Sequence, residues 1–160
     1  MEITGKTSMV LMLADPVGHI RGTLVINQAF DALGLDAAIV PLHVRPFDLA
    51  SVLEVVRSMR NVVGLGIAVP HKIAVIPHLD EVTEVARRSG AVNFIHCNEN
   101  RTTTGTNTDG AGFIAGLTAN GVVVAGRRAL CRRSRRRGSC HCFLFGRCWA
   151  GRAGFCEPQR

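Results

Sequence analysis

Residues 62–72 have the sequence VVGLGIAVPHK, and this stretch decides the fold class. Residues 62–69 are apolar or glycine throughout, which is typical of a strand buried on both faces of a sheet. Pro70 ends the strand, because proline has no backbone N–H to donate to the sheet. Lys72 therefore stands at the start of the next segment, which is expected to be helical.

Outward from this stretch, strand and helix patterns alternate along the chain. Strands are expected at residues 8–14, 37–44, 62–69, 91–97 and 102–105. Helices are expected at residues 23–33, 48–59 and 109–119, and at 72–77 and 81–88 on either side of an interruption at Pro77. Pro41 lies inside the second strand, which predicts that this strand is at an edge. The alternation predicts an α/β fold, a three-layer domain in which helices flank a mostly parallel sheet.

Polar residues gather where the expected strands end. They lie in four short segments: DPVGH at 15–19, VPHK at 69–72, GAVN at 90–93 and NTDG at 107–110. Ligands of open α/β sheets bind at the carboxyl ends of the strands, where such loops converge. A cation at a helix start is poorly placed relative to the helix dipole, which suggests a functional role for Lys72. On this position alone a solvated surface lysine is the commoner case, and it is the combination with the other segments that favours the functional role.

The four segments carry a family resemblance. With ADPVGH at 14–19, AVPHK at 68–72, SGAVN at 89–93 and GTNTDG at 105–110, residues 8–120 resemble the substrate-binding domain of shikimate dehydrogenase. The resemblance implies a cytoplasmic enzyme of aromatic amino-acid biosynthesis. It implies reversible, NADP-linked hydride transfer between shikimate and 3-dehydroshikimate.

The resemblance also implies roles for individual residues. The catalytic pair would be Lys72 and Asp109, and the substrate contacts would include Asn93 and Thr108. When hydride leaves the carbinol carbon, a group must take the hydroxyl proton. Either Lys72 beside Asp109 accepts that proton, or the two hold the hydroxyl in line while a relay accepts it. The pair is one coupled site, so the base is not assigned to one residue.

The chain departs from the family pattern at three polar contacts. After His19 the family usually has a Ser-x-Ser pair, whereas this chain has Ile20, Arg21 and Gly22. The family's threonine before the proline motif is replaced by Ala68. Arg21 could bind the substrate carboxylate as a bidentate clamp, or the substrate could be quinate or another polyol acid.

Three histidines have ordinary interpretations. We expect His19 to make hydrogen bonds within its loop, and His71 and His78 to lie at the surface. Their spacing does not fit a metal site.

The last part of the chain differs from the rest in composition. Residues 1–126 contain 9 basic and 11 acidic side chains, whereas residues 127–160 contain 10 and 1. Five of the six cysteines lie in that last part without a C-x-x-C pair, so we expect no zinc site there. We expect no disulfide framework either, because the preceding domain shows no secretion signal and looks cytosolic. The run RRSRRR at 132–137 lacks interleaved aromatic residues and follows a net acidic domain, which makes nucleic acid an unlikely partner.

The expected organisation is a substrate-binding domain at 1–120, the start of a lost dinucleotide-binding domain at 121–130, and a disordered tail at 131–160. The family continues with a strand and a G-x-G-x-x-G fingerprint, but residues 131–138 read CRRSRRRG. Codons for these residues can be chosen so that a one-base shift gives Ala-Val-Gly-Ala-Gly-Gly-Ala-Gly. We therefore hypothesise a frameshift near residue 130, which sequencing the gene tests. We expect no cofactor-binding residue in this chain and little or no dehydrogenase activity.

Two other functions stay open at this point. One is a non-catalytic module that binds shikimate, quinate or a related acid, and the other is nucleic-acid binding through the arginine-rich tail. No apolar run approaches 18 residues, so we expect no membrane span. We expect the N-terminal stretch to be a first strand and not a signal peptide.

Overall fold

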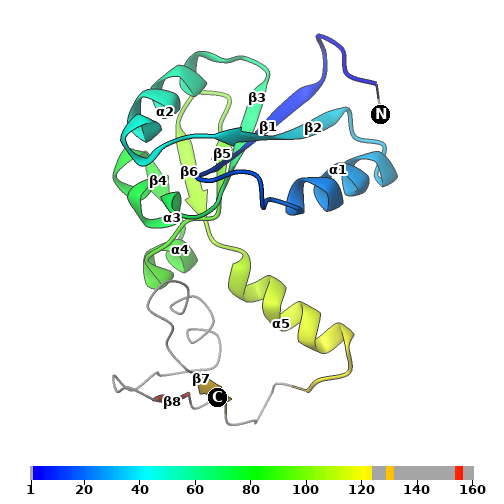
Figure 1. Cartoon of the computed structure of the whole chain (residues 1–160), viewed down its shortest axis with the longest axis vertical. Coiled ribbons are helices and arrows are strands. Elements are labelled where there is room, and N and C mark those ends of the chain that lie inside the picture. Colours follow the sequence, from blue (N-terminus) through cyan, green and yellow to red (C-terminus); the bar gives the residue numbers. More distant parts are fainter. Residues whose placement is uncertain (1, 124–128, 132–153, 157–160) are drawn as a thin grey trace. The chain divides into compact units, whose positions relative to one another are not determined.

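A computed structural model describes residues 2–123, 129–131 and 154–156 of the chain (Figure 1). The chain divides into two compact units. The first consists of Met1–Thr83 and Val92–Thr106, and the second of Glu84–Ala91 and Asn107–Arg160. The two units are described separately.

The first unit is built on a six-stranded sheet with the strand order β2-β1-β3-β5-β6-β4. The strands are β1 (Ser8–Ala14), β2 (Ala37–His43), β3 (Val62–Ile67), β4 (Glu81–Val82), β5 (Phe94–Cys97) and β6 (Thr103–Thr106). The pairs β1–β2, β1–β3 and β4–β6 are parallel, whereas β5 runs antiparallel to both β3 and β6. The predicted α/β class is confirmed, with a mixed sheet in which three of the five neighbouring pairs are parallel.

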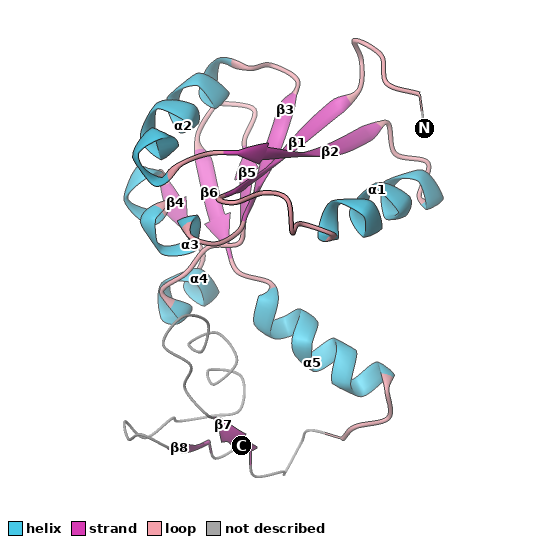
Figure 2. Ribbon diagram, in the orientation of Figure 1, coloured by secondary structure: helices cyan, strands magenta, loops and turns pink. Residues whose placement is uncertain are grey.

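The helices of the first unit lie between these strands. They are α1 (Gly22–Ala32), the 3-10 turn η1 (Pro46–Asp48), α2 (Leu49–Ser58), α3 (His71–Ala74) and the 3-10 turn η2 (Ile76–His78). The chain moves outward from β1 to β2 and then back across β1 to β3. Right-handed crossovers in opposite directions place α1 and α2 on opposite faces of the sheet. Figure 2 shows the two helices on different sides of β1 and β2.

The core lies between the sheet and α2. Leu49, Leu53 and Val56 of α2 are buried, at the 3- to 4-residue spacing of one helix face. They belong to a core that includes Leu13, Ile39, Leu65, Ile67, Val75, Val92 and Ile95. The core thus includes buried residues of β1, β3 and β5, the strands whose ends carry polar segments.

The outer edge of β2 is closed by a side chain of α1. The Asn27 amide donates to the Ile39 carbonyl (3.0 Å) and accepts from the Ile39 N–H (2.8 Å), as a neighbouring strand would. Pro41 faces the same outer side, two residues further along β2, and has no N–H to leave unpaired. The predicted edge position of this strand is confirmed.

Replacing Asn27 by alanine should therefore destabilise the domain. The change leaves both backbone groups of Ile39 without their partner, which should cost about 2 kcal/mol of the free energy of unfolding. Urea unfolding measures the loss. The matched control is Gln28→Ala on the same helix, where the side chain is exposed. Equal stability of the two variants would contradict the role given to Asn27.

Some elements differ from those the sequence predicts. The helix expected from residue 81 begins only at α4 (Glu84–Ser89), because Glu81 and Val82 pair with β6 as β4. A helix of 72–77 is replaced by α3 and η2, with Pro77 within the 3-10 turn. The first difference arises because Glu81 and Val82 pair with a distant strand, and the second because Pro77 interrupts the helix. The spacing of apolar residues reports neither effect.

The second unit contains α4, α5 (Asp109–Ala119) and two short strands, β7 (Ala129–Cys131) and β8 (Gly154–Cys156). β7 and β8 pair antiparallel. Cys131 and Gly154–Cys156 lie in the segment that the sequence analysis expects to be a disordered tail, and both are in strands. The rest of the predicted tail, including the arginine run, lies outside the described residues.

Candidate functional site

The segments that follow β1 and β3 lie side by side. The Ala68 N–H donates to the Leu13 carbonyl (2.9 Å), and the Asp15 N–H donates to the Val69 carbonyl (3.2 Å). These bonds continue the parallel pairing of β1 and β3 past the ends of both strands. The first two of the four predicted polar segments therefore begin at the same end of the sheet, where β1 and β3 end.

The third segment joins them through its backbone. The Val92 N–H donates to the Lys72 carbonyl (2.8 Å), and the Asn93 carbonyl accepts from the Ile67 N–H (2.7 Å). The Asn93 N–H in turn donates to Thr106 at the end of β6 (3.0 Å). Lys72 is half-buried and Asn93 is buried. The structure thus brings the backbones of these two predicted site residues together at the ends of β3 and β5.

The fourth segment lies in the second unit and starts α5. Thr108 precedes that helix and Asp109 is its first residue. Asn107, which the sequence analysis did not single out, organises the turn: its amide donates to the Ala91 carbonyl (2.9 Å), and its side-chain oxygen accepts from the Asp109 N–H (3.0 Å). An asparagine two residues before a helix start is the signal that could have identified it. The pairing of Asp109 with Lys72 stays a prediction.

Arg21 lies between Ile20 and Gly22, where the family's two serines are missing, and Ala68 stands where the family has a threonine. Arg21 is the exposed residue that precedes α1, and the first turn of that helix contains no acidic residue. Ala68 is half-buried, and its carbonyl accepts from the His71 N–H (2.9 Å). His19 is exposed, and its side chain has no hydrogen bond within the described residues, contrary to expectation.

His71 is buried, so its predicted surface position is wrong. Its side chain lies on the same face of α3 as Val75, four residues later, and neither residue has any exposed surface. The Nε2 atom of His71 lies 2.7 Å from the Val44 carbonyl oxygen. The spacing to Val75 is the sequence signal that the expectation overlooked. His78 is exposed, as predicted.

A contact between an aspartate and a histidine lies at the same end of the sheet. Asp15 follows β1, His43 is the last residue of β2, and the His43 Nε2 is 2.7 Å from an Asp15 carboxylate oxygen. Sequence reasoning missed this pair because it depends on β1 and β2 being neighbours. It links the first polar segment to a third strand.

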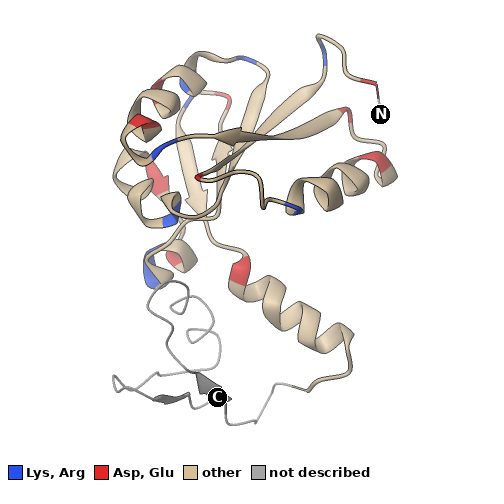
Figure 3. Cartoon of the chain, viewed as in Figure 1, with Lys and Arg blue, Asp and Glu red and all other residues tan. Residues whose placement is uncertain are grey.

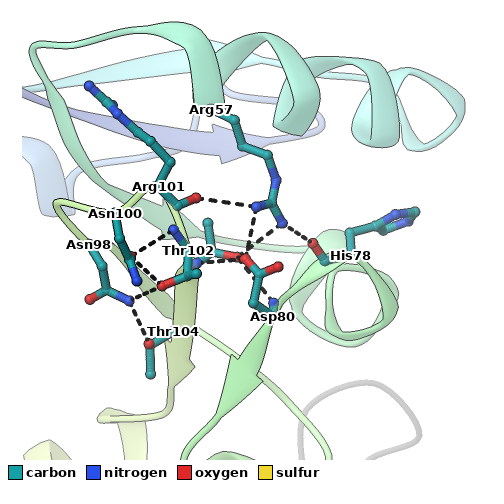
Figure 4. A network of polar contacts seen from close by, with 9 residues as sticks. Arg57, His78, Asp80, Asn98, Asn100, Arg101, Thr102 and Thr104 are labelled. Carbon is teal, nitrogen blue, oxygen red and sulfur yellow. Dashed lines mark hydrogen bonds and ion pairs between the residues drawn. The ribbon is translucent and has the colours of Figure 1, made fainter.

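A second network braces the opposite side of the first unit (Figure 4). Arg57, near the end of α2, donates to the Asp80 carboxylate (2.8 Å), and to the carbonyls of His78 (3.1 Å) and Arg101 (3.3 Å). The same Asp80 oxygen accepts from the N–H (2.7 Å) and the hydroxyl (2.8 Å) of Thr103. These bonds connect α2, the segment after η2 and β6, so we interpret the network as structural.

The network depresses the pKa of Asp80 to about 2, first through the hydrogen bond from Arg57 and then through those from Thr103. A carboxyl whose pKa is lowered in the folded state stabilises that state at pH values above the carboxyl's ordinary pKa of 3.8. The contribution is lost as the pH falls from about 4 towards about 2. In urea unfolding, the stability difference between wild type and Asp80→Asn should therefore shrink over this range. A difference that stays constant with pH would contradict the assignment.

Cys97 does not have the features of a reactive thiol, and the described residues show no metal centre. Burial raises the pKa of the Cys97 thiol, which opposes formation of the nucleophilic thiolate. Within the described ranges there is no group of three or more His, Cys, Asp or Glu residues that could hold a metal ion. Among the same residues, no helix has the length and apolar character needed to cross a membrane.

Comparison of the sequence with known proteins identifies the same family that the four polar segments indicate. A family model described as the shikimate dehydrogenase substrate binding domain matches residues 12–95, just over half of the chain. The chain is 46% identical to a shikimate dehydrogenase (NADP(+)) of Geobacter metallireducens over 131 residues, which cover 81% of this chain and 45% of that protein. It is 41% identical to the corresponding Moorella thermoacetica protein, of which it covers 43%. The chain thus spans less than half the length of these relatives.

Solved structures give the same result. The shikimate 5-dehydrogenase of Listeria monocytogenes, in complex with shikimate and NAD, matches with a TM-score of 0.74 and 31% identity, over 79% of this chain and 43% of that one. The ligand-free 5-ketofructose reductase of a Gluconobacter strain matches with a TM-score of 0.71 and 31% identity, over 78% of this chain and 44% of that one.

Proposed function

Because the chain belongs to the shikimate dehydrogenase substrate-binding domain family, we propose that it binds shikimate or a similar polyol acid at the carboxyl ends of β1 and β3, next to the amino end of the antiparallel strand β5. One observation carries the proposal. The three polar segments of the first unit meet through the bonds Ala68 to Leu13, Asp15 to Val69 and Val92 to Lys72. A cyclic polyol needs several polar groups that converge from different loops, and this edge of the sheet supplies them.

Lys72 and Asp109 are proposed as the proton-transferring pair. An ammonium group beside a carboxylate can hold a ring hydroxyl between them. As the carbonyl forms, the proton can pass to the carboxylate, or to the lysine if it is present as the neutral amine. We assign the base to the pair and not to either residue. Asn93 and Thr108 are proposed to orient the ring through its other hydroxyls.

Arg21 is proposed to bind the carboxylate of the substrate. It stands at the N-terminus of α1, where the helix dipole also favours an anion. Its guanidinium can form two parallel hydrogen bonds to a carboxylate, which replaces the two hydroxyls that are absent at Ile20 and Gly22.

NADP is expected as the cofactor from the named relatives, but it does not fit this chain. The sequence has no G-x-G-x-x-G fingerprint, and the run at 131–138 stands where the family's fingerprint is expected. We therefore assign no hydride transfer to this chain, and expect little or no dehydrogenase activity from it alone. Its own share is to bind and orient the substrate and to hold the proton.

Isothermal titration of the full chain with shikimate and quinate tests the proposal. We expect saturable binding of at least one of these acids. Arg21→Met should weaken that binding about tenfold, because a charge-assisted bidentate contact is lost. Gln28→Met, an equally exposed change on the same helix, serves as the control. Absence of binding by both acids would refute the proposal.

A second candidate is a polyol ketone without a carboxylate. The missing hydroxyls at Ile20 and Gly22 favour it, and the Gluconobacter relative is named for such a compound. In that case 5-ketofructose should bind and Arg21→Met should leave its affinity unchanged.

Nucleic-acid binding through residues 127–160 is the remaining alternative. Figure 3 shows basic and acidic residues interspersed over the first unit, which does not favour an electrostatic surface there. This alternative requires DNA binding that falls steeply with salt and disappears when residues 127–160 are deleted.

A further inference from the structure

His71 is the first residue of α3, and its side chain is completely enclosed. The imidazole Nε2 lies 2.7 Å from the Val44 carbonyl oxygen. A carbonyl oxygen can only accept, so Nε2 carries the hydrogen and donates it. Nδ1 has no hydrogen-bond partner within the described part of the chain, and a hydrogen there would be a buried donor without an acceptor. The ring is therefore held as the Nε2–H tautomer.

The bond to Val44 belongs to a set of hydrogen bonds that connects the start of α3 to the ends of β1, β2 and β3. The Val44 N–H donates to the Ala14 carbonyl (3.0 Å), at the end of β1. The Ala68 N–H donates to the Leu13 carbonyl (2.9 Å), and the His71 N–H donates to the Ala68 carbonyl (2.9 Å). One imidazole thus joins the ends of β1 and β2 to the turn that follows β3.

α3 cannot maintain this position by its own helical bonds. It has four residues, His71–Ala74, and so short a helix is not stable in isolation. Its second tie is on the β5 side, where the Lys72 carbonyl accepts from the Val92 N–H (2.8 Å). If the imidazole is removed, the first turn of α3 keeps the tie to β5 and loses the side-chain tie to β2.

We infer that His71 is a positioning residue for Lys72. Its bond to Val44 fixes the first turn of α3 between β2 and β5, and thereby the place of the Lys72 ammonium group. The inference rests on the proposed role of Lys72. His71 acts through Lys72, because its own side chain is enclosed in the domain.

The chain has only two lysines, Lys6 and Lys72, so selective carbon-13 labelling of lysine gives two side-chain NMR signals. In the full chain, His71→Leu should shift or split the Lys72 signal and leave the Lys6 signal in place. His71→Gln can donate a similar hydrogen bond and should return the Lys72 signal towards its wild-type position. His78→Leu, the same change at an exposed histidine, should move neither signal.

A Lys72 signal that stays at its wild-type position in folded His71→Leu overturns the inference. If that variant does not fold, nitrogen-15 NMR of the wild-type imidazole decides the question. We expect a protonated Nε2 and an unprotonated Nδ1. The opposite tautomer, or rapid exchange between the two, overturns the inference because the bond to Val44 would then not be held.

Titration with shikimate separates this inference from the proposed function. If the wild type binds shikimate, His71→Leu should lower the affinity about tenfold, because a small displacement of a positioned group is enough to weaken its contact. His71→Gln should restore most of that affinity, and equal binding by His71→Leu and wild type counts against the inference. If the wild type binds no shikimate, the proposed function fails for that acid, while the lysine signals still decide the role of His71.

Discussion

Replacing Lys72 by methionine should lower shikimate turnover about a thousandfold in a completed enzyme, because a positioned proton-transferring group typically contributes a factor of this size. The completed enzyme is a chimera. Residues 1–120 of this chain are joined to the part of the Geobacter metallireducens relative that the chain does not span. Methionine keeps the length and packing of the lysine stem and removes its ammonium group. Steady-state oxidation of shikimate with NADP measures the loss.

The control is Lys6→Met in the same chimera. Lys6 is the only other lysine and lies exposed near the N-terminus, so its replacement should leave turnover unchanged. Asp109→Asn should cause a loss comparable to that of Lys72→Met. The double variant should lose little more than either single variant, because residues that act as a unit are not additive. A chimera with Lys72→Met that keeps more than a tenth of the turnover would remove Lys72 from the catalytic pair.

Replacing Gly64 by alanine should cost about 3 kcal/mol of the free energy of unfolding, at the upper end of what overpacking a core usually costs. A Cβ at this position would lie 2.8 Å from the backbone oxygen of Ile95 on the neighbouring strand β5. That oxygen belongs to the ladder between β3 and β5, so it cannot move away without disturbing the pairing. Urea unfolding measures the change.

Gly66→Ala is the matched control, on the same strand and also buried. There the added Cβ would meet the end of the Met12 side chain, with Cε at 2.5 Å and Sδ at 2.8 Å. A methionine side chain can change its rotamer, so this variant should lose about 1 kcal/mol or less. Equal losses in the two variants would show that the backbone contact at Ile95 is not what makes Gly64 necessary.

Much of the fold could be predicted because it depends on local chemistry. The apolar run at 62–69 and the helical spacing at 48–59 each identify an element by its own residues. Pro41 identified an edge strand because its missing N–H can be tolerated only there. The polar segments at 69–72 and 90–93 could each be placed at an end of a strand. That the second lies at the start of β5, beside the end of β3, depends on the antiparallel pairing of these two strands.

Other features of the site depend on partners far along the chain. The Asp15–His43 pair requires β1 beside β2, and the Arg57–Asp80 bond joins residues 23 positions apart. No pattern around either residue states which partner it has. His71 shows the same limit, because its hydrogen-bond partner, the Val44 carbonyl, lies 27 positions earlier in the chain.

The sequence by itself determined the α/β class, the edge position of Pro41 and the four polar segments, because periodicity and proline chemistry act within a few residues. The tertiary structure alone decided the antiparallel direction of β5, the change of Glu81 and Val82 from helix to strand, and the hydrogen bond of His71 to Val44. The physical reason is that strand direction, strand pairing and burial are set by groups brought together from distant parts of the chain. A residue's own neighbours in the sequence do not specify those groups.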